Sequence, residues 1–192
     1  CAKEKLNKGV IISSGDIIFE RNVLQKILNS KDDYSVVVDK NWEEYWKLRF
    51  DDPLDDAETL ILDNKNYITE IGQKAMNLEQ IESQYIGLIQ FQNDATTFVT
   101  DFYERMKKKS LFGKNPLNPK IPFEKSFMTD FLQGLIKENR KIKAIRFDKF
   151  YSKEEIDEIK KEYIPNGIKI IKKQSETTSK VKVKAGLATL FI

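Results

Sequence analysis

A carboxylate stands where a buried strand is expected to end. In "VIISSGDIIFERNVL", residues 10–24, an apolar run is followed by a Gly-Asp pair, and apolar residues at helical spacing begin a few positions later. Asp16 next to such a segment costs desolvation energy unless a cation or hydrogen-bond donors compensate its charge. In open α/β sheets, ligands gather beyond the carboxyl ends of the strands, which makes Asp16 a candidate site residue. A turn-forming Gly-Asp or a helix cap would explain the same letters without any chemistry.

The residue types present limit the chemistry further. The chain has no histidine, which excludes imidazole base catalysis and imidazole metal ligation. Its single cysteine, Cys1, cannot form an internal disulfide, which agrees with a reducing, cytoplasmic location. Acid–base or metal chemistry must therefore use carboxylates, lysines or tyrosines. Asp39 closes a second apolar run, "YSVVVD". It is either another strand-end group that faces the crevice or an ordinary loop acid, and we favour the loop acid.

A sheet and its helices must position these groups. Residues 9–14 and 34–40 have the apolar and β-branched content of buried strands, and residues 20–30 have the one-sided apolar spacing of a helix. Strand, helix and strand in this order predict a right-handed βαβ unit whose strands are parallel neighbours. Residues 58–72 predict a hairpin that turns at Asn64-Lys65-Asn66.

The rest of the chain continues the alternation of strands and helices. Strands are expected at 83–91, 142–147 and 168–171, helices at 94–109, 124–139 and 152–163, an ordered loop at 113–122, and a polar, mobile segment at 172–180. Segment 42–50 fits a strand or a helix. The last twelve residues fit a last strand whose place in the fold the sequence does not give. We therefore expect one α/β domain over 1–163 and an extension of unknown role over 164–192.

Composition restricts the partners. Lys plus Arg is 33 and Asp plus Glu is 30, so the net charge is only +3, which does not predict nucleic-acid binding. No apolar stretch approaches the roughly 20 residues that cross a bilayer. We accordingly expect neither nucleic acid nor a membrane as a partner.

Several motifs occur in an order that is similar to a known family. They are "SGDIIFERNVL", "VVVDKNWEEYWKLRFDDPLDDAETL", "ITEIGQK", "IESQYIGLIQF" and "GKNPLNPKIPFEKSFMTDFLQGLI". Together they resemble the nucleotidyltransferases, and within them the phosphocholine and sugar-phosphate cytidylyltransferases of bacterial cell-surface polysaccharide synthesis, from about residue 4 to 145. The resemblance implies a Rossmann-like mixed sheet flanked by helices. It also implies a reaction that transfers a nucleoside monophosphate from a nucleoside triphosphate, CTP by preference, to a small phosphorylated acceptor and releases pyrophosphate. The acceptor would be phosphocholine or a sugar phosphate.

The resemblance also assigns roles to individual residues. It implies that Asp16 binds the Mg²⁺ that bridges the nucleotide phosphates, and that Lys74 approaches the acceptor phosphate. The positions implied to shape the acceptor pocket are Glu58, Glu82, Tyr85 and Asp130. Each has a plainer explanation: Lys74 as an exposed lysine after a hairpin, Glu82 and Tyr85 as a hairpin rim, and Asp130 as part of a solvated helix face.

The second metal ligand of the family is an aspartate in a Trp-x-Glu-Ile-Asp strand. The chain offers Asp157 in "EEID", which we place ahead of Asp148 at the end of "IKAIRFD". Ser152 and Glu155 around the same letters also form a capping box, which would make them the start of a helix instead.

One departure from the family affects activity. The family begins with a strand and a glycine-rich basic loop that grips the nucleotide, and these 192 residues contain nothing like it. We therefore expect this chain alone to have little or no nucleotidyl transfer activity. The alternative is a non-catalytic module, either a degenerate nucleotidyltransferase or a binding protein that is lipid-anchored at Cys1.

Overall fold

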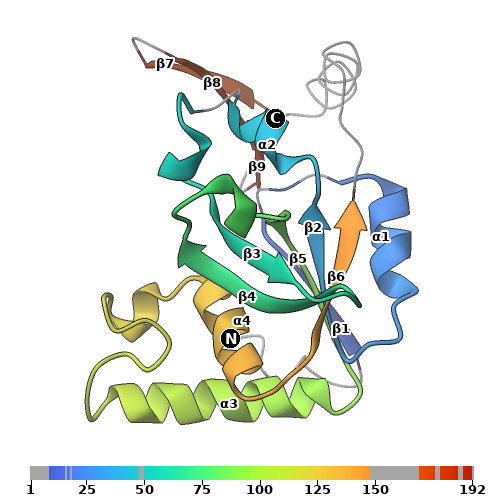
Figure 1. Ribbon diagram of the computed structural model, residues 1–192, viewed down its shortest axis with the longest axis vertical. Helices are drawn as coiled ribbons and strands as arrows, with labels where there is room; N and C mark the ends of the chain where they lie inside the picture. The colour runs from blue at the N-terminus through green and yellow to red at the C-terminus, as the bar shows by residue number, and fades with distance from the viewer. Residues whose placement is uncertain are drawn as a thin grey trace.

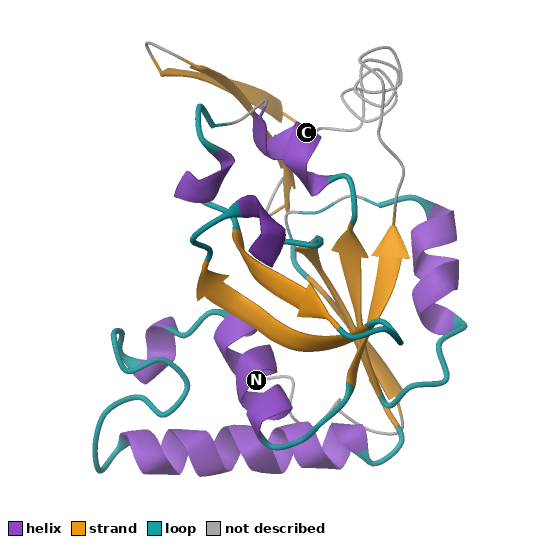
Figure 2. Ribbon diagram, viewed as in Figure 1, coloured by secondary structure: helices purple, strands orange, loops and turns teal. Residues whose placement is uncertain are grey.

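The computed structural model describes residues 9–15, 17, 19–47, 50–147, 169–175, 178–185 and 188–191. Six strands form one mixed sheet in the order β1-β5-β2-β6-β4-β3, with helices packed against it (Figures 1 and 2). This is the α/β class, with a mixed sheet flanked by helices, that the sequence predicts. No helix in the described ranges is long and apolar enough to span a membrane.

Four neighbouring strands form one side of the sheet, from its β1 edge inward. β1 (Gly9–Ser13) and β2 (Tyr34–Asp39) both pair antiparallel with β5 (Gln84–Gln92), which lies between them. β6 (Ile142–Phe147) pairs parallel with β2. The prediction that the first two strands are parallel neighbours is therefore wrong: they run in the same direction, but β5 is inserted between them. A local βαβ pattern carries no information about a strand that arrives from 50 residues downstream.

The predicted hairpin is confirmed. β3 (Glu58–Leu62) and β4 (Tyr67–Lys74) pair antiparallel around the Asn-Lys-Asn turn. Asn66 adopts a left-handed φ of 60°, which asparagine tolerates better than most residues. Asp63 fixes the turn, because its Oδ1 accepts hydrogen bonds from the backbone N–H groups of Lys65 and Tyr67, both at 2.8 Å.

Helices cover the two faces of the sheet. They are α1 (Arg21–Leu28), α2 (Trp42–Lys47), α3 (Ala95–Ser110) and α4 (Met128–Lys137). Alternation along β2 separates two apolar clusters: Val36 and Val38 pack with α3 and α4, whereas Val37 packs with α1. Segment 42–50, ambiguous in the sequence, thus begins as helix α2.

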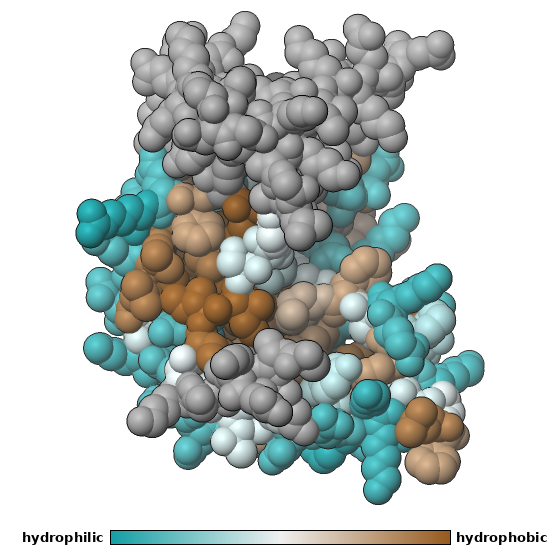
Figure 3. All heavy atoms as spheres, turned by 180° about the vertical axis from the view of Figure 1, so that it is seen from behind, coloured by the Kyte–Doolittle hydropathy of each residue, from teal (hydrophilic) through white to brown (hydrophobic). Residues whose placement is uncertain are grey.

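β1 is less buried than its apolar letters predict. Its residues are exposed or half-buried, and its outer edge has no partner strand among the described residues. The rear of the molecule also shows a broad apolar area (Figure 3). The apolar residues that are only partly buried around α1 are Ile11, Ile17, Phe19, Leu24, Ile86, Ile145 and Phe147.

The C-terminal extension contains a second, three-stranded sheet. β7 (Lys169–Ser175), β8 (Thr178–Ala185) and β9 (Ala188–Phe191) pair antiparallel in that order. The short strand expected at 168–171 is therefore longer. The segment expected to be mobile, 172–180, supplies residues to β7 and β8. The helix expected at 152–163 lies outside the described residues.

Candidate functional site

The ends of several strands meet at one edge of the sheet. β1, β2 and β6 run in the same direction and end there, and the antiparallel β5 begins there. Gln84 and Tyr85, the first residues of β5, are consequently the register partners of Asp39 and Val38 in β2. In open α/β sheets this carboxyl edge is where ligands bind.

Asp39 is the most unusual group at this edge. Only 6% of its surface is exposed, and its Oδ1 accepts a hydrogen bond of 2.8 Å from the backbone N–H of Asn41. Burial raises the pKa of the Asp39 carboxyl to about 6, and the hydrogen bond from Asn41 only partly opposes this. The expectation of an ordinary loop acid is therefore wrong, because the strand continues through Asp39 and its neighbours cover it.

Gln84 connects Asp39 to the hairpin, and sequence reasoning passed over it. It is buried, it faces Asp39 across β5 and β2, and its Nε2 donates a 2.5 Å hydrogen bond to the carbonyl of Glu58. The only signal in the sequence is a polar side chain at the start of an apolar strand, between Glu82 and Tyr85, to which the family resemblance gives a role. Gln84 therefore links the first residue of the hairpin to the start of β5, opposite Asp39.

Glu58 and Lys74 lie opposite each other in the hairpin. They are register partners at the open end of β3 and β4, where Lys74 is exposed and Glu58 half-buried. Burial raises the pKa of Glu58, a hydrogen bond from the Thr129 side chain opposes the rise, and the negative charge of Asp130 adds to it. The structure therefore places Glu58 opposite Lys74 and close to Asp130. All three residues are expected to contact the acceptor.

Asp130 is not on a solvated helix face, as its plainer explanation supposed. It is buried in the first turn of α4, where Oδ2 accepts from the backbone N–H of Phe127 at 2.9 Å and Oδ1 accepts from Asn118 Nδ2 at 3.0 Å. Both carboxylate oxygens are thus used to cap the helix and to hold the preceding loop. Asp130 therefore holds the turn of α4 that carries Thr129.

The two residues expected at the rim differ from each other. Glu82 is exposed and ties its segment to β3, because its Oε1 accepts from the backbone N–H of Leu62 and its own N–H donates to Leu60, both at 2.9 Å. Tyr85 is half-buried against the main core, and burial raises the pKa of its phenol. Glu82 is therefore held as a rim residue, while Tyr85 contributes mostly apolar surface.

Close backbone contacts hold the hairpin against α4 and α2. Gly72 has a φ of +78°, and a Cβ built on it would lie 2.6 Å from the Cβ of Thr129, so only glycine allows this approach. The N–H of Ile71 donates to Gln133 Oε1 of α4 at 2.8 Å. Trp42 of α2 donates from Nε1 to the carbonyl of Ile81 at 3.0 Å and packs with residues that follow or precede the hairpin strands.

Comparison with known proteins identifies the relatives of this chain. No protein-family model matches it. It is 41% identical over 149 residues to the CTP:phosphoglutamine cytidylyltransferase of Campylobacter jejuni, a match that covers 77% of this chain. This chain is a relative of the cytidylyltransferases. It spans 55% of the length of that relative.

A solved structure agrees with the fold of this cytidylyltransferase relative. The inositol-1-phosphate CTP transferase from T. maritima superposes with a TM-score of 0.50 at 16% identity, covering 80% of this chain and 57% of that one. At such low identity the likeness concerns the fold alone. The expected resemblance and the expected nucleotidyltransferase-like architecture are both confirmed.

The metal site expected for a cytidylyltransferase falls outside the described part of the chain. Asp16, Asp148 and Asp157 are all outside it, and the described residues contain no group of three acidic, cysteine or histidine side chains that could hold a metal. The strands that precede Asp16 and Asp148 do end at the carboxyl edge. They are three strand spacings apart, about 14 Å in a flat sheet.

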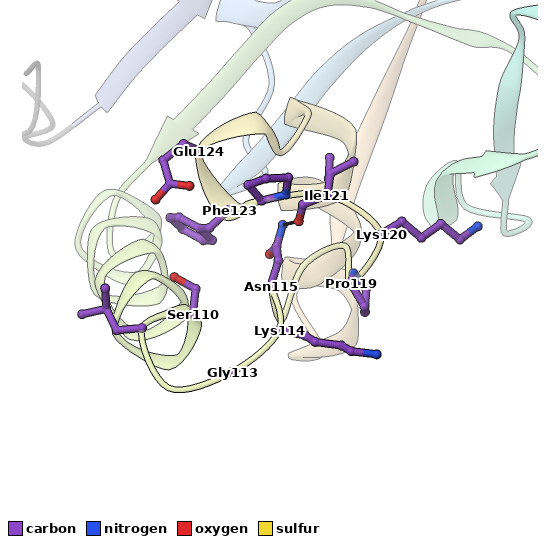
Figure 4. A pocket seen from close by; sticks show the side chains of 11 residues that line it. Ser110, Gly113, Lys114, Asn115, Pro119, Lys120, Ile121, Phe123 and Glu124 are labelled. Atoms are coloured by element: carbon purple, nitrogen blue, oxygen red, sulfur yellow. Dashed lines mark hydrogen bonds between the residues drawn. The ribbon is translucent and has the colours of Figure 1, made fainter.

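A hollow lies elsewhere on this cytidylyltransferase relative, in the loop predicted at 113–122. Its volume is about 390 Å³, and Figure 4 shows it between the end of α3 and the loop. In Figure 1 this loop lies at the far end of α3, away from the tips of β2 and β6. It is therefore a separate feature from the carboxyl edge.

Proposed function

We propose that the protein transfers a cytidylyl group from CTP to a phosphorylated acceptor and releases pyrophosphate. The observation that carries the proposal is the 41% identity over 149 residues to a CTP-using cytidylyltransferase. In this reaction an acceptor phosphate oxygen attacks the α-phosphorus of CTP, a new P–O bond forms, and pyrophosphate leaves with the electrons of the broken bond. Catalysis then depends on positioning and on charge, which suits a protein without histidine.

We propose phosphoglutamine as the first acceptor to test, because the Campylobacter jejuni relative is a CTP:phosphoglutamine cytidylyltransferase. The two charged residues at the open end of the hairpin support an acceptor that carries both signs of charge. Lys74 offers an ammonium to a phosphate, and the partly buried Glu58 offers a carboxylate to an ammonium group. Phosphocholine also carries a cation, whereas a neutral sugar phosphate would leave Glu58 without a charged partner.

The residues at the carboxyl edge would have different roles in this reaction. We propose that Lys74 contacts the acceptor phosphate and that Glu58 contacts the rest of the acceptor. Gln84 would hold Glu58 in place through its carbonyl, and Asp130 would fix the α4 turn that carries Thr129. Tyr85 and Glu82 would form the wall and rim. These assignments rest on placement and on the family resemblance.

We propose that Mg²⁺ is the cofactor and that Asp16 binds it together with Asp157, ahead of Asp148. Bound Mg²⁺ would draw negative charge from the phosphates. The end of β1 at the carboxyl edge supports Asp16, and the choice of Asp157 ahead of Asp148 rests on the family resemblance. In the complete protein, Asp16→Asn should abolish Mg²⁺-dependent turnover and leave the melting temperature nearly unchanged. Turnover like that of the wild type in this variant would remove the assignment.

Pyrophosphate release tests the proposed function. CTP, ATP, GTP and UTP are each supplied with phosphoglutamine, phosphocholine or a sugar phosphate, to the complete gene product and to the 192-residue chain. We expect release only with CTP and one class of acceptor, at ordinary enzyme rates on the order of 10 per second for the complete protein. We expect little or none for the chain alone. Release by none of these combinations would favour the non-catalytic alternative.

Two expectations about cellular context stay predictions. They are a cytoplasmic location and a role in building cell-surface polysaccharides.

A further inference from the structure

The far end of α3 carries an exposed apolar and basic surface that the proposed reaction does not use. Leu111 is 74% exposed and Phe112 is 84% exposed, the highest value among the large apolar residues of the described part. We define the α3 tip as residues 107–125. Its exposed lysines are Lys107, Lys108, Lys109, Lys114, Lys120 and Lys125, and its one acidic residue is Glu124.

The α3 tip is a built structure and not a frayed helix end. Asn115 is buried, and its Nδ2 donates to the carbonyl of Ile121 at 3.1 Å and to Ser126 Oγ at 2.8 Å. The Phe123 ring packs 5.6 Å from that of Tyr103 of α3. In Figure 4 the side chains of Lys114 and Lys120 extend from the loop in the same direction. The fold therefore presents the exposed groups of the tip in a defined arrangement.

Helix electrostatics explain only part of this composition. Lys107, Lys108 and Lys109 complement the negative end of the α3 dipole. That effect falls off within the last turn and does not account for the lysines of the loop. The helix dipole also does not explain why Leu111 and Phe112, two adjacent large apolar residues that follow the end of α3, are exposed to water.

We propose that the α3 tip docks the protein peripherally on an anionic lipid surface. Apolar side chains flanked by lysines match both layers of such a surface, since the rings and alkyl groups enter the acyl boundary while the ammonium groups meet the headgroup phosphates. The six lysines face one acid, which gives charge complementarity to anionic lipid. A protein interface is a poorer fit, because lysine is depleted there.

This proposal replaces the expectation of no membrane partner. That expectation rested on the absence of a long apolar run, which excludes a spanning helix but not a docked loop. The letters "KKKSLFGK" do not tell whether Leu111 and Phe112 are buried under the loop that follows. Only their exposed fractions identify the tip as a candidate anchor.

Vesicle sedimentation tests the proposal. The full chain is mixed with vesicles of phosphatidylcholine alone or with about one third phosphatidylglycerol, at low and high salt. We expect binding to the anionic vesicles only, weakened by salt. Replacing Lys107, Lys108 and Lys109 by Gln should weaken it on the order of 100-fold, since each lysine near the surface is worth about 5-fold. Leu111→Ser with Phe112→Ser should weaken it by at least 10-fold.

Matched variants separate the tip from general surface effects. Lys26, Lys31 and Lys40 are exposed lysines elsewhere and are replaced together by Gln; Met76, 79% exposed, is replaced by Ser. Both changes should alter binding less than 2-fold. In Phe112→Trp, the added tryptophan emission should shift to the blue on anionic vesicles. Absence of wild-type binding, equal losses in tip and control variants, or binding to an oligonucleotide but not to vesicles would each overturn the proposal.

Discussion

Asp39 predicts a pH dependence of stability that can be measured without interference from histidine. Its folded-state pKa of about 6 lies above the ordinary value of 3.8. Between these values the folded protein holds a proton that the unfolded chain has lost, so the free energy of unfolding falls as pH rises from about 4 through 6. Because the chain has no histidine, no imidazole titrates in the same interval.

The size of the effect follows from the shift. A difference of 2.2 pKa values (6 minus 3.8) corresponds to about 3 kcal/mol, of which about 2 kcal/mol falls between pH 4.5 and pH 8. Asp39→Asn removes the charge and keeps an oxygen that can accept the hydrogen bond from Asn41. The variant should therefore gain about 2 kcal/mol over the wild type between the two pH values, or about 4–8 °C in melting temperature.

Urea unfolding of both proteins at pH 4.5, 6 and 8 measures this difference. Other carboxyls, Glu58 included, titrate in both proteins and cancel in the comparison. Asp55→Asn, which removes an exposed acid, is the control for the loss of one negative charge. Curves for Asp39→Asn and the wild type that stay parallel from pH 4.5 to 8 would refute the burial of an ionisable Asp39.

Three further predictions test the placement of the hairpin and its residues. Gly72→Ala should destabilise the fold by about 1–3 kcal/mol because of its positive φ and its contact with Thr129, whereas Gly113→Ala, with open space around it, should stay within about 0.5 kcal/mol in urea unfolding. Trp42→Phe removes the hydrogen bond to the Ile81 carbonyl and should cost about 1 kcal/mol; no loss of thermal stability would contradict that bond. In the complete protein, Lys74→Ala should raise the KM for the acceptor by about 10-fold or more with the KM for CTP little changed, and an effect on CTP alone would place Lys74 elsewhere.

Local sequence patterns predict the individual helices and strands of this fold better than they predict which strands lie next to each other in the sheet. The hairpin turn at Asn66, the amphipathic α3 and the β-branched β2 all have signals within a few residues. The insertion of β5 between β1 and β2 has none, because strand order depends on contacts between segments far apart in the chain. A pattern of alternating elements therefore gives the class of the sheet but not its order.

The candidate site shows the same division. Lys74 and Glu58 could be selected from the letters and the family resemblance, and the hairpin does bring them together. The burial of Asp39 and the bridge from Gln84 to the Glu58 carbonyl depend on packing across three strands. Asp130 illustrates the reverse case, since a residue selected for a pocket has both oxygens used in holding α4 and its loop.

The central claim is that this protein makes a cytidylylated product, and phosphorus NMR of the reaction mixture tests it most directly. The complete protein is incubated with CTP, Mg²⁺ and phosphoglutamine, and the products are followed by ³¹P resonance and by mass. We predict that the acceptor phosphate resonance is replaced by the paired resonances of a diphosphate linked to cytidine, with one pyrophosphate per product. CTP and acceptor that remain unchanged, or pyrophosphate that appears without the linked diphosphate, would contradict the account.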